Sequence, residues 1–491
     1  MEKIISCFIP VKENEDFVTT VNQLLSADVV EKIFLMSAEK PDIIPENCEW
    51  LECKNFYSTG AIQSIGDNAN NPYTLIYTKT SPLQLGAYSL ERFVNLIDDT
   101  EAGMIYSDYY EKKNGELYAH PVIDYQTGSL RDDFNFGSVL FYRTEALKNG
   151  IAKFSHEFNF AAFYDLRLKV SQTYSLFRIP EFLYTEIELD TRKSGEKQFD
   201  YVDPKNREVQ IEMEKACTQH LKEIDGYLKP EFEKITFDEG KFEFEASVVI
   251  PVRNRVRTIE DAIKSILMQK TKFKFNLIIV DNHSTDGTSE IIKKYAAKSD
   301  LIVHIVTERK DLGIGGCWTA AIMDERCGRF AVQLDSDDLY IDENTLQKVV
   351  DAFYEQQCAM VVGTYKIVNI DLETIPPGII DHKEWTPDNG RNNALRINGL
   401  GAPRAFYTPV LRKIKVPNVS YGEDYAVGLA ISRNYQIGRI YEPLYLCRRW
   451  DGNSDAAADI VKQNAYNTYK DRIRSIELLA RMAKNKNSKT R

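Results

Sequence analysis

Short apolar runs alternate with helical patterns along the second half of the chain. The runs are rich in β-branched residues, as strands buried on both faces of a sheet are. Thr258 is placed to cap a helix whose apolar residues recur at helical spacing. The predicted strands are residues 246–252, 277–280 and 302–306, with a fourth after Phe330, and the predicted helices are residues 258–267, 289–297 and 317–325. This order predicts a doubly wound parallel sheet of the α/β class.

Polar residues follow these strands directly. Asp281 ends the second strand, Gly313 lies in the loop after the third, and Asp335 follows the fourth. Ligands of doubly wound sheets bind at the carboxyl ends of the strands. We therefore expect these three residues to line one crevice.

An acidic segment follows the fourth strand. Residues 335–338 (DSDD) place three carboxylates within four positions. Such a cluster is costly unless a cation neutralises it, and hard oxygen ligands suit Mg²⁺ or Mn²⁺. The alternative is an acidic turn without a ligand. We name Asp335 and Asp337 as the candidate metal ligands.

Three motifs together resemble family 2 glycosyltransferases of the GT-A fold, over about residues 245–455. They are residues 250–254 (IPVRN), residues 280–288 (VDNHSTDGT) and residues 335–338 (DSDD). The resemblance implies an inverting enzyme that takes a sugar from a nucleotide-sugar, most simply a UDP-sugar, and passes it to an acceptor hydroxyl in glycan or polysaccharide biosynthesis. It also implies that Pro251, Arg253 and Asp281 hold the nucleoside, and that the acidic segment holds the ribose and the metal on the diphosphate.

The acidic pair in residues 421–425 (YGEDY) precedes an apolar helical pattern. In similar enzymes such a pair supplies the catalytic base, which must reach the acceptor hydroxyl. Asp424 is the first candidate for the base and Glu423 the second. The alternative is that the pair caps the helix.

Two departures from the family pattern concern the donor. His283 stands where the family has a glycine, and it either contacts the base or ribose or is an ordinary turn residue. In residues 447–454 (CRRWDGNS), Trp450 stands where a histidine often approaches the metal. Arg448 or Arg449 is then the expected cation for the diphosphate leaving group.

The first half repeats this pattern without its acids. Residues 8–13 (FIPVKE) echo residues 249–254 (VIPVRN), and echoes of the later strands follow in the same order. Residues 78–81 (TKTS) replace the acidic segment, and Lys79 would repel a cation. We predict a degenerate, non-catalytic GT-A-like domain, which binds glycan, fixes an oligomer or braces the catalytic domain.

The predicted organisation is two tandem GT-A-like domains and a C-terminal helix. The chain has 491 residues, more than one core usually holds. The segments are residues 1–195 (degenerate domain), 196–244 (helical linker), 245–455 (catalytic domain) and 456–491 (helix and basic tail). The last helix is predicted to end near residue 483, with an apolar stripe of Tyr466, Tyr469, Ile473, Ile476 and Leu479 or Ala480 and a basic surface, Arg474 and Arg481 included, that meets acids only at Asp471 and Glu477. It packs on its own domain or a sister subunit, or contacts a membrane surface that carries a lipid-linked acceptor.

Composition narrows the setting. The net charge of −11 disfavours a nucleic-acid partner. The eight cysteines form no CxxC pair and are expected to be reduced thiols. With no apolar stretch of about 18 residues, the expectation is a cytoplasmic protein.

Two other functions are open at this stage. A nucleotidyltransferase that makes sugar nucleotides shares the fold, but residues 253–257 (RNRVR) lack the glycines of its phosphate loop. A non-catalytic sugar-binding scaffold would not need the acids of the second half.

Overall fold

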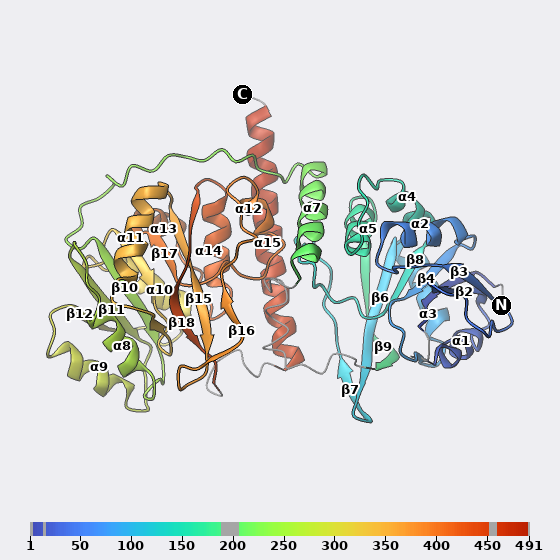
Figure 1. Cartoon of the computed structure of the whole chain (residues 1–491), viewed down its shortest axis with the longest axis horizontal. Helices are drawn as coiled ribbons and strands as arrows, with labels where there is room; N and C mark the ends of the chain where they lie inside the picture. The colour runs from blue at the N-terminus through green and yellow to red at the C-terminus, as the bar shows by residue number, and fades with distance from the viewer. Residues whose placement is uncertain (1–2, 13–15, 188–205, 451–458, 490–491) are drawn as a thin grey trace. The chain divides into compact units, whose positions relative to one another are not determined.

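The computed structural model describes residues 3–12, 16–187, 206–450 and 459–489, and these form two compact units. The first unit takes in most of residues 1–193, Arg207–Tyr227 and the helix α15 up to Ile476. The second runs from Leu228 through the second half and takes in α15 from Glu477 onward. Each unit contains one mixed sheet flanked by helices (Figure 1).

The sheet of the second unit has the order β12-β11-β10-β13-β17-β15-β18-β14, with β16 paired to β15. The strands β12, β11, β10 and β13 are parallel, as predicted, while β17 runs antiparallel to both of its neighbours. The strands are β10 (Ala246–Val252), β11 (Phe275–Asp281), β12 (Ile302–Val306), β13 (Phe330–Gln333), β14 (Leu339–Tyr340), β15 (Met360–Val368), β16 (Thr374–Ile380), β17 (Arg404–Tyr407) and β18 (Ile437–Arg448).

The sheet of the first unit has the same topology, β3-β2-β1-β4-β8-β6-β9-β5 with β7 paired to β6. The register agrees too, because Phe8 pairs with Ile76 in one unit as Val249 pairs with Gln333 in the other. The strands are β1 (Ile5–Pro10), β2 (Val30–Ser37), β3 (Cys48–Glu52), β4 (Tyr73–Tyr77), β5 (Gln84–Leu85), β6 (Met104–Lys113), β7 (Glu116–His120), β8 (Val139–Arg143) and β9 (Leu176–Ile187). The predicted internal repeat is therefore a repeat of the fold.

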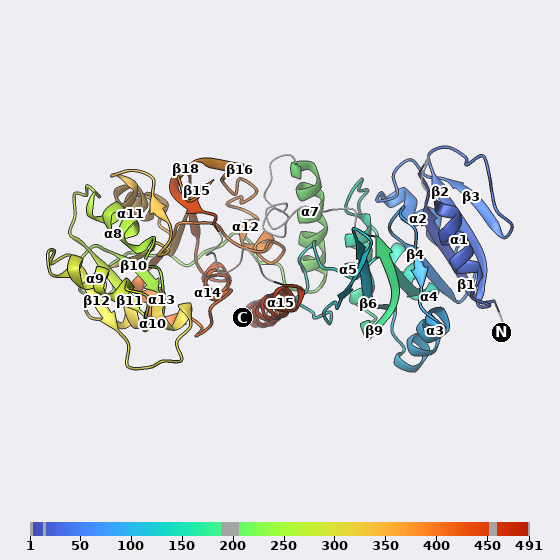
Figure 2. The same ribbon diagram turned by 90° about the horizontal axis from the view of Figure 1, so that it is seen from below.

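Helices cover both faces of each sheet. In the first unit α1 packs beside β2 and β5 (Figure 2), and in the second α10 packs on β10 and β11. The helices of the first unit are α1 (Phe17–Leu25), α2 (Thr59–Asn68), α3 (Ser89–Thr100), α4 (Thr144–Ile151), α5 (Ala162–Ser171) and α7 (Arg207–Glu223). Those of the second are α8 (Ile259–Leu267), α9 (Thr288–Ala296), α10 (Ile314–Met323), α11 (Thr345–Gln356), α12 (Gly390–Asn393), α13 (Thr408–Ile414) and α14 (Glu423–Ser432).

The helix α7 lies in the segment predicted to link the domains, yet it packs on α5 of the first unit. The sequence predicts that Val209, Met213, Ala216, Cys217 and Leu221 face inward, and the last three of these are buried. Its carboxylate Glu223 pairs with the buried Lys169 of α5, with 2.5 Å between Nζ and Oε1. The helix is therefore an integral part of the first unit.

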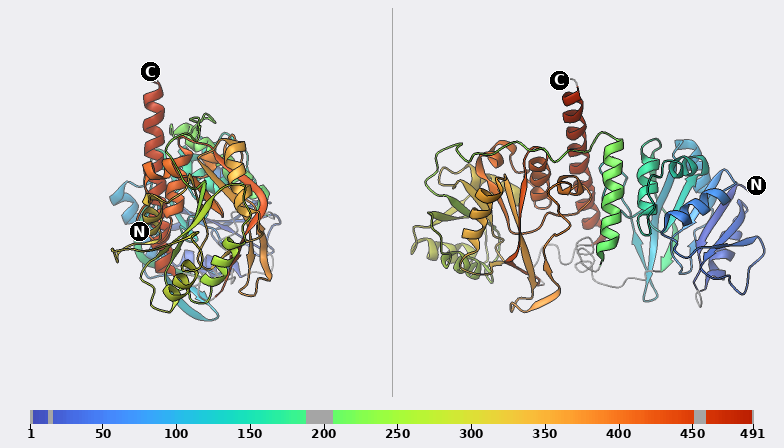
Figure 3. Two further views of the ribbon diagram at one scale, coloured as in Figure 1. Left: turned by 90° about the vertical axis from the view of Figure 1, so that its left-hand side faces the viewer. Right: turned by 45° about the horizontal axis from the view of Figure 1, so that its top comes forward.

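The C-terminal helix α15 (Ile460–Lys489) continues six residues beyond the predicted end near residue 483 (Figure 3). The apolar stripe predicted to face inward is wrong at Ile476 and Leu479, which are exposed. Arg474 and Arg481, counted as part of a basic surface, are instead buried in ion pairs with Asp471 and Glu477. Carboxylates at helical spacing explain the difference, since i,i+3 and i,i+4 pairs give each arginine a carboxylate partner within the helix.

No helix in the described part of the chain is long and apolar enough to cross a membrane. The eight cysteines are free thiols, five of them buried.

Candidate active site

The acidic segment begins where β13 ends, at Gln333. Both carboxylate oxygens of Asp335 accept hydrogen bonds from Gln333 Nε2, each at 2.9 Å. The backbone N–H of Asp335 donates to the hydroxyl of the buried Tyr445 on β18, at 3.0 Å. Burial raises the pKa of Asp335, and the Arg404 guanidinium opposes the shift. The sheet thus fixes this carboxylate in a site where negative charge is costly.

The remaining carboxylates of the segment lie against the end of β18. Asp338 is buried, and its Oδ1 accepts the backbone N–H of Arg448 at 2.8 Å. Asp337 is less buried; its Oδ2 lies 3.6 Å from Arg255 Nε and 3.4 Å from Trp450 Nε1. Burial, followed by repulsion from Asp337 and Asp335, holds the pKa of Asp338 well above its usual range. Three carboxylates thus crowd one strand end, and their mutual repulsion disfavours the charged form of Asp338.

Arg448 is 2% exposed and lies at the same strand end. Its Nη1 contacts Asp261 Oδ2 at 3.2 Å, but its Nε and Nη2 find no hydrogen-bond partner among the residues that the structure describes. A buried guanidinium with unused donors is suited to an anion. The next residue, Arg449, donates its backbone N–H to the carbonyl of Val368, at the end of β15.

The loop after β10 is tied to the loop after β11. The N–H of Asn254 donates to Ser284 Oγ at 3.0 Å, and Asn254 Oδ1 accepts the N–H of Thr285 at 2.8 Å. Thr258 occupies the N-cap position of α8, but its side chain makes no cap; its hydroxyl donates to the carbonyl of Ser336 at 3.0 Å. The loop that carries Arg253, which is exposed, is therefore joined to both neighbouring strand ends.

Asp281 lies at the end of β11 and is buried. Its Oδ1 accepts the N–H of Ser284 at 3.0 Å, and Oδ2 accepts the Ser289 hydroxyl and faces His304 Nε2 at 3.5 Å. Burial raises its pKa, but these partners outweigh burial and lower it overall. The carboxylate therefore organises its own turn, and its role in holding a nucleoside stays a prediction.

His283 has a left-handed backbone, with φ of 58°. Only glycine adopts this conformation without steric cost, which gives a physical reason for the glycine of the family pattern. The imidazole Nε2 contacts the carbonyl of Arg309 at 3.1 Å, which ties the turn to the loop before α10.

The acidic pair begins α14. Glu423 is 8% exposed, and burial, followed by repulsion from Asp424, raises its pKa to about 8. Its Oε2 has no hydrogen-bond partner among the described residues. Asp424 is partly exposed and pairs with Arg404, with 2.9 Å between Oδ2 and Nη1. Asp424 also contributes to the raised pKa of Asp335, so the two predicted acidic motifs converge.

Gly315 lets α10 approach the loop that carries the acidic pair. Its N–H donates to the carbonyl of Val419 at 2.9 Å, and a Cβ at this position would lie 1.8 Å from the carbonyl oxygen of Pro417. The Gly313 N–H donates to Asn418 Oδ1 at 2.7 Å. Only glycines allow this contact, so the predicted glycine loop positions the acidic pair.

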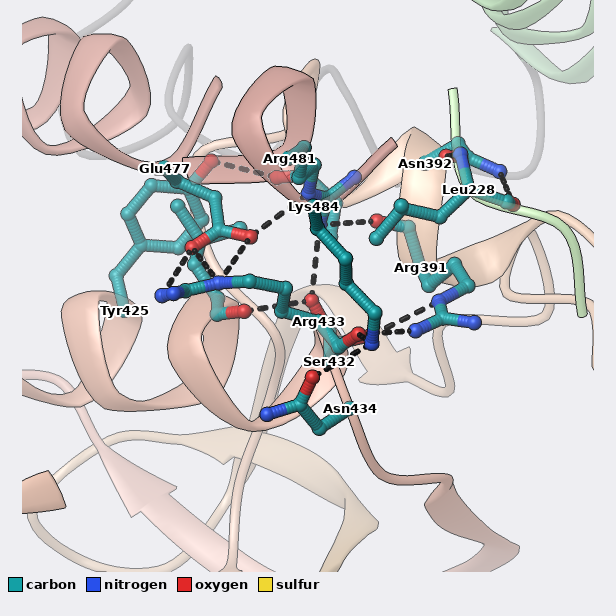
Figure 4. A network of polar contacts seen from close by, with 12 residues as sticks. Leu228, Arg391, Asn392, Tyr425, Ser432, Arg433, Asn434, Glu477, Arg481 and Lys484 are labelled. Atoms are coloured by element: carbon teal, nitrogen blue, oxygen red, sulfur yellow. Dashed lines mark hydrogen bonds and ion pairs between the residues drawn. The ribbon is translucent and has the colours of Figure 1, made fainter. Parts of the chain in front are cut away.

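The far end of α14 is held by α15 within the second unit (Figure 4). Arg481 donates to Glu477 Oε1 at 2.7 Å, to the Arg391 carbonyl at 2.9 Å and to Ser432 Oγ at 3.0 Å. Arg391 in turn donates to the Ser432 carbonyl at 2.9 Å. Cations at a helix C-terminus stabilise the helix, so this network fixes the helix that carries the acidic pair.

The structure thus brings together Asp335, Asp337, Arg448, Glu423 and Asp424. Sequence reasoning missed two cations among them, Arg404 and Arg255, whose only signal is a charged residue at or beside a strand end. In the described part of the chain no group of three His, Cys, Asp or Glu residues is arranged to hold a metal ion. A cation here would need oxygen ligands from a bound diphosphate or from water.

The first unit lacks these acids. Counting from the paired strands, Thr78 and Thr80 stand at the positions of Asp335 and Asp337. The helices α5 and α14 each have ten residues and end at Ser171 and Ser432, so Ala162 and Phe163 replace the acidic pair. Lys79 pairs with the buried Glu186, with 2.5 Å between Nζ and Oε1.

A mixed sheet of this strand order with helices on both faces is a GT-A-like fold, and it is present twice, with the acidic segment only in the second unit. Residues 247–413, about a third of the chain, match the model of glycosyl transferase family 2.

Curated relatives match part of the chain. The chain is 26% identical over 238 residues to a poly(ribitol-phosphate) beta-glucosyltransferase of Bacillus spizizenii, covering 47% of this chain and 36% of the relative. It is 29% identical over 167 residues to the poly(ribitol-phosphate) beta-N-acetylglucosaminyltransferase TarS of Staphylococcus aureus, covering 34% of this chain and 28% of the relative. The chain thus spans about a third of the length of these relatives.

Among solved structures, S. aureus TarS 1-349 in complex with UDP-GlcNAc is similar at a TM-score of 0.37 and 23% identity. The match covers 48% of this chain and 72% of that one.

Proposed function

We propose that this chain is an inverting glycosyltransferase that moves a sugar from a nucleotide-sugar, most simply a UDP-sugar, to a hydroxyl of a glycan or lipid-linked acceptor. The observation that carries the proposal is the convergence of Asp335, at a strand end, with Asp424, at a helix start 89 positions later, on the single guanidinium of Arg404. Direct transfer requires a donor site and a base at opposite sides of one sugar. The family match and the two relatives described above, both named as sugar transferases, support it.

The donor side is built from the strand ends. Pro251, Arg253, Asp281, His283 and Gly313 would border the nucleoside, and Arg448 would bind the diphosphate through its two unused donors. Because Arg448 is buried and fixed by Asp261, it would stabilise the leaving diphosphate without reorganising. Arg449, at the same strand end, adds a second positive charge.

Asp335 and Asp337 would hold a divalent cation, Mg²⁺ or Mn²⁺, together with diphosphate oxygens. The fit rests on the donor set: Asp335, Asp337 and Asp338 place three carboxylates at one strand end, and hard oxygen ligands of this kind suit such a cation. When bound, such an ion neutralises charge on the leaving diphosphate. Asp335 and Asp337 are both partly exposed, so a donor could reach either carboxylate.

Asp424 would accept the proton of the acceptor hydroxyl. Glu423 is less suited to this role, because a pKa of about 8 leaves it mostly protonated at neutral pH. Arg404 would orient Asp424 and keep its carboxylate apart from that of Asp335.

The test is release of the nucleotide from a panel of UDP- and GDP-sugars, with Mn²⁺ or with EDTA. We expect turnover of one donor that EDTA abolishes and that Asp337→Asn reduces by at least 100-fold, while the exposed Asp300→Asn, a matched control, behaves as the parent. Turnover that ignores both EDTA and Asp337→Asn would refute the metal assignment. If no donor in the panel is turned over, and none binds and raises the thermal unfolding midpoint, the proposed activity is refuted.

A further inference from the structure

The first unit repeats the framework of the candidate active site as well as its sheet. The segment before α2 contacts the segment before α5 just as the segment before α10 contacts the segment before α14. The N–H of Thr59 donates to the carbonyl of Phe158 at 2.9 Å, and in the second unit Gly315 donates to Val419 at the same distance. The edge of the first sheet is therefore shaped like a transferase site from which the acids are missing.

Aromatic rings fill this edge in place of the acids. Phe163, at the position of Asp424, packs on Phe56 and Tyr57, with ring centroids 5.3 Å and 5.9 Å away. Phe56 and Tyr57 contact each other edge-on at 5.8 Å. Tyr57 is 49% exposed although its neighbours are partly buried, so one ring of an otherwise packed cluster faces solvent.

The backbone around this cluster is rigid. Asn55 Nδ2 donates to the Asn159 carbonyl at 2.7 Å, and Thr59 Oγ1 accepts the Phe158 N–H at 2.9 Å. Glu212 of α7 accepts the N–H groups of Asn159, Phe160 and Ala161 at 2.7 to 3.2 Å. An aromatic surface that is fixed before binding loses little entropy when a ligand packs on it.

Polar groups border the rings. The Tyr57 hydroxyl lies 3.5 Å from the Thr78 carbonyl, and Thr78 precedes Lys79, whose Nζ pairs with Glu186. Glu186 is 2% exposed, and its Oε2 has no hydrogen-bond partner among the residues that the structure describes. A buried carboxylate oxygen without a donor is costly, and a ligand hydroxyl would satisfy it.

We propose that this edge of the first unit binds a pyranose ring of a glycan. A sugar has an apolar face of C–H groups, which suits an aromatic face, and hydroxyls at its rim, which suit the polar groups beside Tyr57. A nucleoside diphosphate does not fit, because the carboxylates that would hold its metal are replaced by Thr78 and Thr80. The glycan would be a distal part of the acceptor; that last step alone rests on the proposed transfer activity.

The test uses the full chain and saturation-transfer NMR with cellohexaose, maltohexaose and chitohexaose, without nucleotide. We expect saturation to pass from the protein to the ring C–H protons of at least one oligosaccharide. Tyr57→Ala should weaken its binding about threefold to tenfold, the loss of one stacking ring. Tyr57→Phe should retain binding, and Phe177→Ala should not change it, since Phe177 is 43% exposed at the opposite end of the sheet.

Each result is decisive for this site. If the parent shows no NMR saturation transfer to any of the three oligosaccharides, or if Tyr57→Ala binds as the parent does, the proposal is wrong. If Tyr57→Ala instead changes the sedimentation coefficient, the edge is an interface between copies and the proposal is also wrong. These outcomes need no turnover, so they are separate from failure of the proposed activity. With an active donor, Tyr57→Ala should raise KM for a long acceptor and leave kcat unchanged.

Discussion

Arg404 and Asp424 form an ion pair, 2.9 Å from Nη1 to Oδ2, between the first residue of β17 and the first turn of α14. The same Nη1 donates to the Gly401 carbonyl at 2.8 Å, and Arg404 opposes the pKa shift of Asp335. One guanidinium therefore acts on both the candidate base and the candidate metal ligand.

Arg404→Gln removes the guanidinium that pairs with Asp424 while keeping a polar side chain. We expect kcat to fall about 10-fold to 100-fold, because a misplaced catalytic group is costly in rate even where it is not lost. The Kd of the donor should change less than kcat. The matched control is Arg326→Gln, which removes an exposed pair with Asp324 in the same unit. Equal kcat in both variants would show that Arg404 has no part in the reaction.

Arg481 tests the network at the far end of α14. Arg481→Met leaves Glu477 buried with one cation fewer, and breaking a buried pair costs about 3–5 kcal/mol of unfolding free energy. Thermal unfolding should show a lower midpoint for this variant, whereas Arg472→Met, at an exposed position of α15, should unfold like the parent. An unchanged midpoint for Arg481→Met would mean that α15 does not hold the second unit together.

His220 gives the first unit a dependence on pH. Burial lowers its pKa to about 4, from 6.5 in an unfolded chain. The folded state therefore favours the neutral imidazole, so this contribution to stability is complete above pH 6.5 and is lost as the pH falls from 6.5 to 4. The shift corresponds to about 3 kcal/mol.

The check is the thermal midpoint of the parent and of His220→Gln between pH 7 and pH 4. The parent should lose stability over this window more steeply than the variant, which cannot titrate there. Parallel curves would show that His220 is accessible to water in the folded state.

Local patterns predicted the second sheet well. The predicted strand 246–252 and the strand 302–306 coincide with β10 and β12. These runs are buried on both faces, where hydrophobicity and β-branching agree with the tertiary structure. The repeat in the first unit was predicted because strand sequences similar to those of the second half occur there in the same order. The same strands need the same apolar residues even where the acidic site residues are absent.

Other features depended on contacts that sequence does not show. Arg474 and Arg481 follow a helical pattern that predicted exposure, but their partners Asp471 and Glu477 allow burial. Arg404 lies within an otherwise apolar stretch, and only the fold shows that Asp424 lies beside it. In the same way Thr258 stands at the N-cap position of α8, yet its hydroxyl donates a hydrogen bond to the Ser336 carbonyl.

We propose that Asp335 and Asp337 bind the donor and that Asp424 is the base of the same transfer reaction. Asp424→Asn is the sharpest test of this division. The substitution keeps the shape of the side chain and removes the oxygen that would accept the proton. Loss of a general base typically lowers the rate about 10²-fold to 10⁴-fold. Asp424 lies outside the donor motifs, so its interaction belongs to the transition state and the donor Kd should be retained.

The measurement is kcat together with the Kd of the nucleotide-sugar, for Asp424→Asn and for Glu423→Gln. We expect that Asp424→Asn loses kcat at an unchanged Kd, while Glu423→Gln keeps most of its activity because Glu423, with a pKa of about 8, is already mostly protonated at pH 7. A dead Glu423→Gln beside an active Asp424→Asn would reverse the two roles. Parent kcat in both variants would contradict the claim, and the pair would then be only the start of α14.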